Sequence, residues 1–254
     1  MGWSAAQYSR FEDERTRPAR DLVAAIPRDT ARIAVDLGCG PGNSTQVLAA
    51  RYPDAQIIGV DSSADMIRAA RERLPQHAFA VDDIGTWRAS QPVDVIVANA
   101  SLQWLPDHAR LYPQLLSQLD GGGCLAVQTP DNLDQPPHRV ARALAASAGW
   151  ASTIGHVRHP DRHDAAWYHA LLKPLCRRVD VWRTTYFHPL QDHDAVVEWF
   201  KGSALGPYLA PLDEAARPEF LAAYREGIAR QMPAQDDGSV LLPFPRLFVV
   251  ARVS

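Results

Sequence analysis

The sequence has few cysteines and no long apolar run. Only three of its 254 residues are cysteines, and they lie far apart at Cys39, Cys124 and Cys176. Isolated cysteines in odd number argue against a disulfide framework or a zinc site and favour reduced thiols in the cytoplasm. No apolar stretch approaches the length of a membrane span, so we expect no membrane partner. Residues 1–14 also have neither the charged nor the apolar region of a secretion signal.

A concentrated positive charge is also missing. The net charge is −3, and the 26 lysines and arginines are scattered rather than grouped. Nucleic-acid binding needs a basic patch, so we expect no nucleic-acid partner. A bound anion must therefore be met by a few local arginines. The composition, 46% hydrophobic and 22% charged, is that of an ordinary globular α/β protein.

Short apolar runs alternate with amphipathic segments from residue 32 onward. This alternation predicts a largely parallel sheet with helices on both faces. The predicted strands are residues 33–36, 56–61, 77–81, 93–98 and 122–129, and the predicted helices are residues 44–51, 63–74 and 107–119.

The last third of the chain has a different pattern. Residues 179–186 and 247–252 are predicted strands, and the segment between them is helical but broken by glycine and proline. We expect one domain spanning residues 1–254, which carries two additions. These are an N-terminal lid over residues 1–30 and a helical cap at about residues 190–235. Residues 150–164 show no clear period and are interpreted as a loop or lid.

The stretch VDLGCGPGNST predicts a nucleotide-binding turn after the first strand. Its glycines are Gly38, Gly40 and Gly42, whereas the dinucleotide fingerprint would need a glycine where Asn43 stands. Asp36 places a carboxylate at the end of the strand, where it would repel a pyrophosphate and attract a cation. A nicotinamide cofactor is therefore disfavoured.

S-adenosylmethionine fits this turn, because it has a sulfonium and an ammonium group but no phosphate. Asp36 could accept from the ammonium or orient water and backbone around it. Asp61, at the end of the second strand, could accept from both ribose hydroxyls. After the third strand, Asp82 or Asp83 could accept from the adenine amino group, and we favour Asp83. The predicted cofactor-binding residues are Asp36, Gly38, Cys39, Gly40, Asp61, Ser62, Met66, Asp83, Ile84 and Asn99.

Several segments together resemble the trans-aconitate 2-methyltransferase family of class I methyltransferases. They are ERTRPARDL, VDLGCGPGNST, GVDSS, VANASLQWLPDH, VQTPDN, VWRTTYFH and FPRLFVVAR. The resemblance implies a Rossmann-like sheet of seven strands in the order 3-2-1-4-5-7-6, with the last strand antiparallel. It also implies a small tricarboxylate substrate, whose product is the monomethyl ester of trans-aconitate, together with S-adenosylhomocysteine.

Carboxyl methylation needs no general base, because a carboxylate is already ionised at pH 7. We therefore predict positioning residues and no catalytic side chain. Arginine suits the two carboxylates that do not react, since its planar fork matches a carboxylate. Arg246 is the first choice, and Arg183 either binds the substrate or pairs with Asp180. The predicted substrate-binding residues are Arg246, Arg183, Tyr8, Arg15, Gln103, Trp104 and His188.

Two other functions compete with this prediction. The chain could methylate another acid, such as a malonyl group on a carrier protein, although the sequence has no basic block to dock one. It could also bind S-adenosylmethionine without catalysis. The histidines of GHVRHPDRHDAAWYH resemble metal ligands in their spacing, but Pro160 interrupts any helix there, and no metal is predicted.

Overall fold

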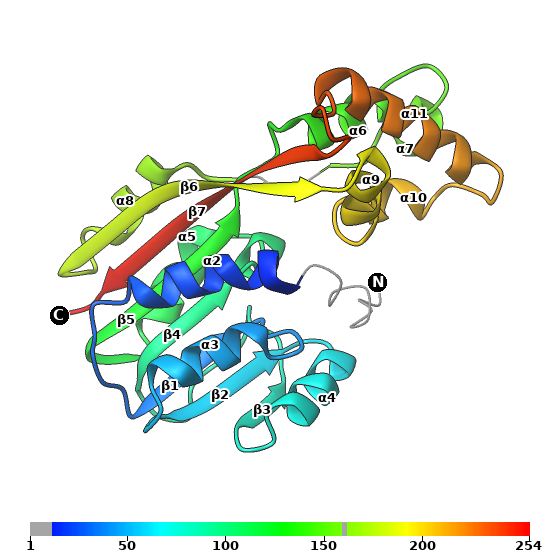
Figure 1. The fold of residues 1–254 in the computed structure, drawn as a ribbon. Coiled ribbons are helices and arrows are strands. Elements are labelled where there is room, and N and C mark those ends of the chain that lie inside the picture. The colour runs from blue at the N-terminus through cyan, green and yellow to red at the C-terminus, as the bar shows by residue number, and fades with distance from the viewer. Residues whose placement is uncertain (1–11, 159–161) are drawn as a thin grey trace. The chain divides into compact units, whose positions relative to one another are not determined.

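The computed structural model describes residues 12–158 and 162–254 (Figure 1), and of residues 12–15 only the backbone. The chain forms two compact units. The first comprises residues 1–130, 160–184 and 246–254, and the second comprises residues 131–159 and 185–245. In the described part of the chain, no helix combines the length and the apolar character needed to cross a membrane.

Seven strands form a single sheet in the order β3-β2-β1-β4-β5-β7-β6, which confirms the predicted fold. Strands β1 to β5 are parallel, and β7 runs antiparallel to β5. The strands are β1 (Ile33–Leu37), β2 (Gln56–Asp61), β3 (Ala78–Val81), β4 (Val93–Asn99), β5 (Leu119–Pro130), β6 (Arg178–Leu190) and β7 (Val240–Arg252).

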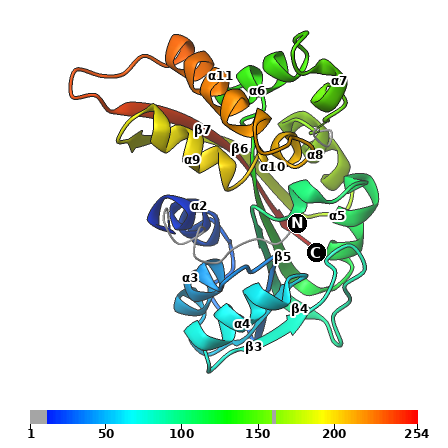
Figure 2. The ribbon, with the colours of Figure 1, turned by 90° about the vertical axis from the view of Figure 1, so that its right-hand side faces the viewer.

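Helices of the first unit cover both faces of its sheet (Figure 2). Helices α2 (Glu12–Ala24), α3 (Asn43–Arg51) and α4 (Ala64–Arg73) lie on one face, whereas α5 (His108–Leu116) and α8 (Ala165–Leu172) lie on the other. The central strand β4 is consequently buried along nearly its whole length. This burial explains why its sequence is a continuous apolar run instead of an alternating one.

The second unit contains α6 (Pro136–Ala145), α7 (Ala151–Ile154), α9 (His193–Lys201), α10 (Gly206–Leu209) and α11 (Ala216–Gln231). The last three lie within residues 190–235, where the sequence predicts a helical segment. Helix α6 packs on α11 at Gly227, where an added Cβ would lie 2.5 Å from Val140 Cγ1. Residues 150–164 are not wholly irregular as expected, since α7 forms one helical turn there.

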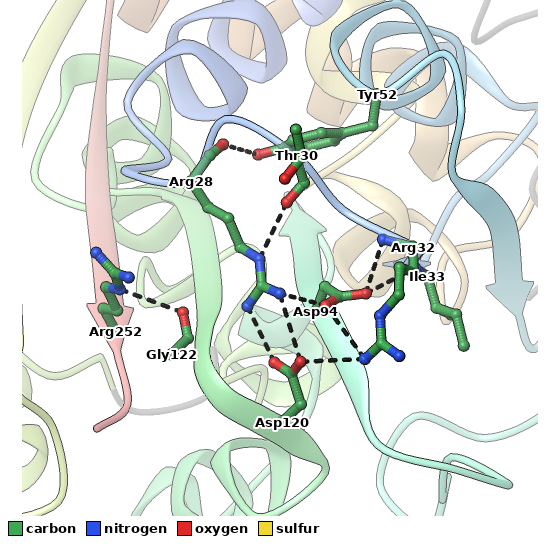
Figure 3. Close-up of polar contacts among 9 residues, drawn as sticks. All are labelled: Arg28, Thr30, Arg32, Ile33, Tyr52, Asp94, Asp120, Gly122 and Arg252. Atoms are coloured by element: carbon green, nitrogen blue, oxygen red, sulfur yellow. Dashed lines mark hydrogen bonds and ion pairs between the residues drawn. The ribbon is translucent and has the colours of Figure 1, made fainter.

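A buried carboxylate fixes the linker between α2 and β1 (Figure 3). Asp94 Oδ2 accepts from the backbone N–H groups of Arg32 and Ile33, each at 2.8 Å. The Arg28 guanidinium contacts Asp94 and also donates to Asp120 at 3.0 Å. Burial alone would raise the pKa of Asp94, but the two backbone donors and the Arg28 charge outweigh it and lower that pKa.

Replacement of Asp94 by alanine is expected to lower the free energy of unfolding at pH 7 by about 3 kcal/mol, because it leaves two backbone donors unpaired and removes one of the two carboxylates that Arg28 contacts. Urea denaturation measures this. A lowered folded-state pKa contributes stability that is complete above the unfolded value of about 3.9 and is lost as the pH falls through the folded value. The difference between the wild type and Asp94→Ala should therefore shrink below about pH 4.

Asp29→Ala is the matched control for this prediction. Asp29 lies in the same linker and pairs with Arg51, but its side chain is fully exposed. An exposed pair contributes little, so this variant should unfold like the wild type. Equal effects of the two substitutions would show that the Asp94 contacts do not stabilise the linker.

Candidate functional site

The glycine turn after β1 adopts a backbone that only glycine tolerates well. Gly38, Gly40 and Gly42 have φ angles of 75°, 54° and 95°. A Cβ on Gly38 would also lie 2.2 Å from the Cβ of Ser101, so a side chain at this position would collide with the chain that follows β4. The Gly38 N–H donates to Val60 O at 2.7 Å. The turn is thus held against the ends of β2 and β4.

Asp61, at the end of β2, fixes the turn from the other side. Its Oδ2 accepts from Gly40 N–H and its Oδ1 accepts from Ser63 N–H, both at 2.9 Å. Each carboxylate oxygen has further acceptor capacity, so Asp61 can still accept from two hydroxyls. A neighbouring diol, such as that of a ribose, matches this arrangement.

A pocket opens at the carboxyl ends of β1, β2 and β4. Its described lining has two carboxylates, Asp61 and Asp83, and no lysine, arginine or histidine. This charge suits a cationic nucleoside and opposes a pyrophosphate. The predicted residues that the structure gathers there are Gly38, Gly40, Asp61, Ser62, Met66, Asp83, Ile84, Asn99 and Trp104.

Five lining residues were not predicted from the sequence. Ala100 has a φ of 53°, which is strained for a residue with a side chain, and it places the following serine under the glycine turn. Alanine and leucine carry no functional signal in a sequence. The missed residues are Pro41, Ser63, Ala100, Ser101 and Leu105.

Asp36 lies behind the glycine turn and does not line the pocket. It is fully buried, and its Oδ2 accepts from the hydroxyls of Ser44 and Thr45, both at 2.7 Å. Its Oδ1 has no hydrogen-bond partner among the described residues. Burial raises the pKa of Asp36 to about 6, although the two hydroxyls act against this shift. Its position fits the indirect part of its predicted role, in which it orients backbone and water.

The tandem aspartates after β3 differ in position. Asp83 lines the pocket and its Oδ1 accepts from Gly85 N–H at 2.8 Å, whereas Asp82 accepts from Asp83 N–H and faces elsewhere. Cys39 is buried beside a small cavity that Asn99 also lines.

The short 3-10 helix η1 (Leu102–Trp104) contributes Trp104 to the pocket lining. Trp104 is 51% exposed and is a wall of the pocket, not a core residue. Gln103 is buried, and its Nε2 donates to Ala100 O at 2.7 Å. Gln103 therefore stabilises the backbone between β4 and η1 and does not line the pocket.

His108 anchors η1 from the side away from the pocket. Its Nε2 lies 2.9 Å from Leu102 O, and its Nδ1 lies 2.6 Å from the Tyr168 hydroxyl. A carbonyl only accepts, so Nε2 carries the proton, and the neutral ring can accept from Tyr168. Burial lowers the pKa of His108, which favours this neutral form. The sequence did not single out His108.

Arg246 and Arg183 do not line the described pocket. Arg246 is buried on β7, and its Nη1 donates to Gln128 Oε1 at 3.2 Å. Arg183 is exposed on β6. Asp180, the structural partner considered for Arg183, lies 3.8 Å from Arg178.

The remaining predicted substrate residues lie in other parts of the chain. His188 belongs to the second unit, where its ring stacks on Trp199 at 5.0 Å. Tyr8 is outside the described residues. Arg15 is part of α2, but only its backbone is described. Their predicted roles stay predictions.

Gly38→Ala is expected to lower the free energy of unfolding by about 2 kcal/mol or more, because a side chain at this φ is strained and meets Ser101. Calorimetry should also show at least a roughly tenfold loss of affinity for S-adenosylhomocysteine. Adding Ser101→Gly removes the collision and should restore part of both losses. Gly149→Ala, where a Cβ meets nothing within 4 Å, should change neither quantity. Wild-type affinity in Gly38→Ala would contradict the close-approach argument.

Comparison with known proteins agrees with this geometry. A methyltransferase-domain family matches residues 29–186. A trans-aconitate 2-methyltransferase of Methylobacterium radiotolerans is 52% identical, and one of Afipia carboxidovorans is 51% identical, each over 98% of both chains. Among solved structures, phosphoethanolamine N-methyltransferase 2 of Haemonchus contortus, in complex with S-adenosyl-L-methionine, is similar with a TM-score of 0.55. It is 14% identical over 94% of this chain and 53% of its own, which shows the fold alone. The chain belongs to the trans-aconitate 2-methyltransferase family.

Proposed function

We propose that this protein transfers a methyl group from S-adenosylmethionine to a carboxylate of trans-aconitate and so forms a monomethyl ester. The observation that carries the proposal is the described pocket, which has two carboxylates and no cation and lies at the carboxyl ends of the parallel strands, where ligands bind in open α/β sheets. The relatives that are about half identical over nearly the whole chain carry the name of this activity.

Different pocket residues bind different parts of the cofactor. Asp61 holds the ribose diol, because its two oxygens are already oriented by Gly40 and Ser63. Asp83 accepts from the adenine amino group, and Met66 and Ile84 pack on the two sides of the ring. Both of these apolar side chains are buried at the pocket wall. Because the glycines of the turn have no Cβ, the amino-acid end of the cofactor can approach the backbone closely.

The reaction depends on the alignment of the two reactants more than on acid or base catalysis. S-adenosylmethionine supplies an activated methyl group, which the ionised substrate carboxylate accepts. The protein must align the two reactants and exclude water, and alignment of this kind can supply roughly 7–11 kcal/mol of the barrier. Trp104, on the wall of the pocket, is placed to exclude water. The buried His108 takes part by holding η1 and not as a base.

The proposed function predicts labelled methyl transfer to trans-aconitate. Radiolabelled S-adenosylmethionine should give a product whose label base treatment releases as methanol, which identifies an ester. An Asp61→Ala sample is the negative control. Absence of transfer, with cofactor binding intact by calorimetry, would refute trans-aconitate as the substrate. It would direct the search to other acids, including carrier-bound malonyl groups.

Asp61→Ala is expected to weaken S-adenosylhomocysteine binding by roughly 10- to 100-fold, because it removes a charged acceptor that also holds the glycine turn. Asp65→Ala is the matched control: Asp65 follows closely in sequence, but its side chain is exposed and pairs with Arg68 on the helix surface. Calorimetry at pH 7.5 measures both. Unchanged affinity in Asp61→Ala would overturn the assigned ribose site.

The affinity for S-adenosylmethionine should fall as the pH decreases through about 6. Burial raises the pKa of Asp36 to about 6, so its negative charge is lost below that value. The cofactor ammonium stays charged in this range, since an α-amino group titrates near 8. Binding at pH 5 should be roughly tenfold weaker than at pH 7, provided that the ionised form is the one that binds. Asp36→Asn should bind weakly and with little pH dependence; a full pH dependence in that variant would assign it to another group.

We also infer a cytoplasmic protein, because Cys39, Cys124 and Cys176 are all free thiols.

A further inference from the structure

Four polar side chains form a row across one face of the sheet, at the carboxyl ends of its parallel strands. Asn99 on β4 is the register partner of Gln128 on β5. Arg246 on β7 is opposite Pro130, two residues after Gln128, and Asp36 on β1 is opposite Val97, two residues before Asn99. Side chains alternate with a period of two along a strand, so all four point to the same face. The row runs from the glycine turn to Arg246.

Gln128 has an orientation that the structure fixes. Arg246 can only donate, so the amide oxygen of Gln128 must be the atom that faces Arg246 Nη1, at 3.2 Å. The amide nitrogen therefore points the other way. It is buried and has no hydrogen-bond partner among the described residues. Asn99 Oδ1 is likewise buried without a partner, so the two register partners do not satisfy each other.

The buried amide donor of Gln128 calls for an acceptor, and the positive charge of the neighbouring Arg246 favours an anionic one. A carboxylate is the simplest such group. Asn99 connects this pair to the pocket, because it lines the pocket and is paired with Gln128 in the sheet. A carboxylate at Gln128 would therefore lie one strand away from the cofactor site.

We propose that Gln128 is a substrate-binding residue, whose Nε2 donates to a non-reacting carboxylate of the acid that Arg246 also holds. This inference rests on the proposed function, since it concerns the acid to be methylated. It adds Gln128 to the substrate-binding residues that the sequence predicted, none of which is on β5.

Gln128→Glu is the decisive substitution. Glutamate keeps the acceptor for Arg246 but replaces the amide donor with a negative oxygen that repels a carboxylate. We expect the KM for trans-aconitate to rise about tenfold or more, with the Kd of S-adenosylhomocysteine within twofold of the wild type. An unchanged KM would show that the Gln128 amide nitrogen does not bind the substrate carboxylate.

Gln128→Met is the second variant, in case the added charge prevents folding. Methionine has a similar volume and no donor, and it should also raise the KM severalfold while thermal unfolding stays cooperative. Arg246→Ala should raise the same KM, and the combination with Gln128→Met should raise it by less than the product of the two single effects, because both residues bind one group. Independent effects of the two substitutions would contradict a shared carboxylate.

Gln118→Glu is the matched control, since Gln118 Oε1 accepts from Ala89 N–H far from the row. It should leave the KM unchanged. The two hypotheses fail differently. If the wild type transfers no methyl group to trans-aconitate, the proposed function fails. If the wild type is active but Gln128→Glu keeps its KM, or loses cofactor affinity to the same extent, only the assignment of Gln128 fails.

Discussion

The carboxylate of Asp61 is the group on which the rest of the site depends. One of its oxygens binds the N–H of Gly40 in the turn, and the other binds the N–H of Ser63 at the start of α4. A single side chain at the end of β2 thus joins the glycine turn to the beginning of the next helix. Both oxygens are oriented before any ligand arrives, so a diol can bind without a further loss of side-chain freedom.

The chain that follows β4 packs closely against the glycine turn and stabilises it. Ser101 Oγ donates to Leu37 O at 2.7 Å, directly before Gly38, and the absent Cβ of that glycine leaves room for the serine. The strained φ of Ala100 brings the serine into this position. The glycine turn and the chain after β4 are therefore mutually dependent, and the strained backbone of Ala100 at the pocket is part of that arrangement.

The sequence predicts well what depends on local residue type. Glycine spacing and the acidic residues that follow the first three strands locate Asp61 and Asp83, and apolar runs locate the central strands. It cannot show burial, which depends on tertiary packing, and so it gives no sign that Asp36 lies behind the turn. Gln128 was missed because a glutamine in an apolar strand has no distinctive pattern. Helix α6 was missed because its buried face is built partly from proline, histidine and alanine.

Charge is distributed unequally along the carboxyl ends of the strands, and this affects where each of the two substrates is favoured. The described pocket has carboxylates at Asp61 and Asp83, whereas the buried cation of the polar row is Arg246 on the other side of β5. A polycarboxylate is repelled from the first region and attracted to the second, by about 1 kcal/mol per close charge pair in water and about 4 kcal/mol where water is largely excluded. A cationic nucleoside has the opposite preference. Methyl transfer removes one negative charge from the acid and the positive charge from the sulfur, so both products carry less charge into this fixed field than the reactants do. In the proposed binding mode the ester has one charge fewer than the acid with which to bind Arg246, so this cation holds the product less strongly than the substrate.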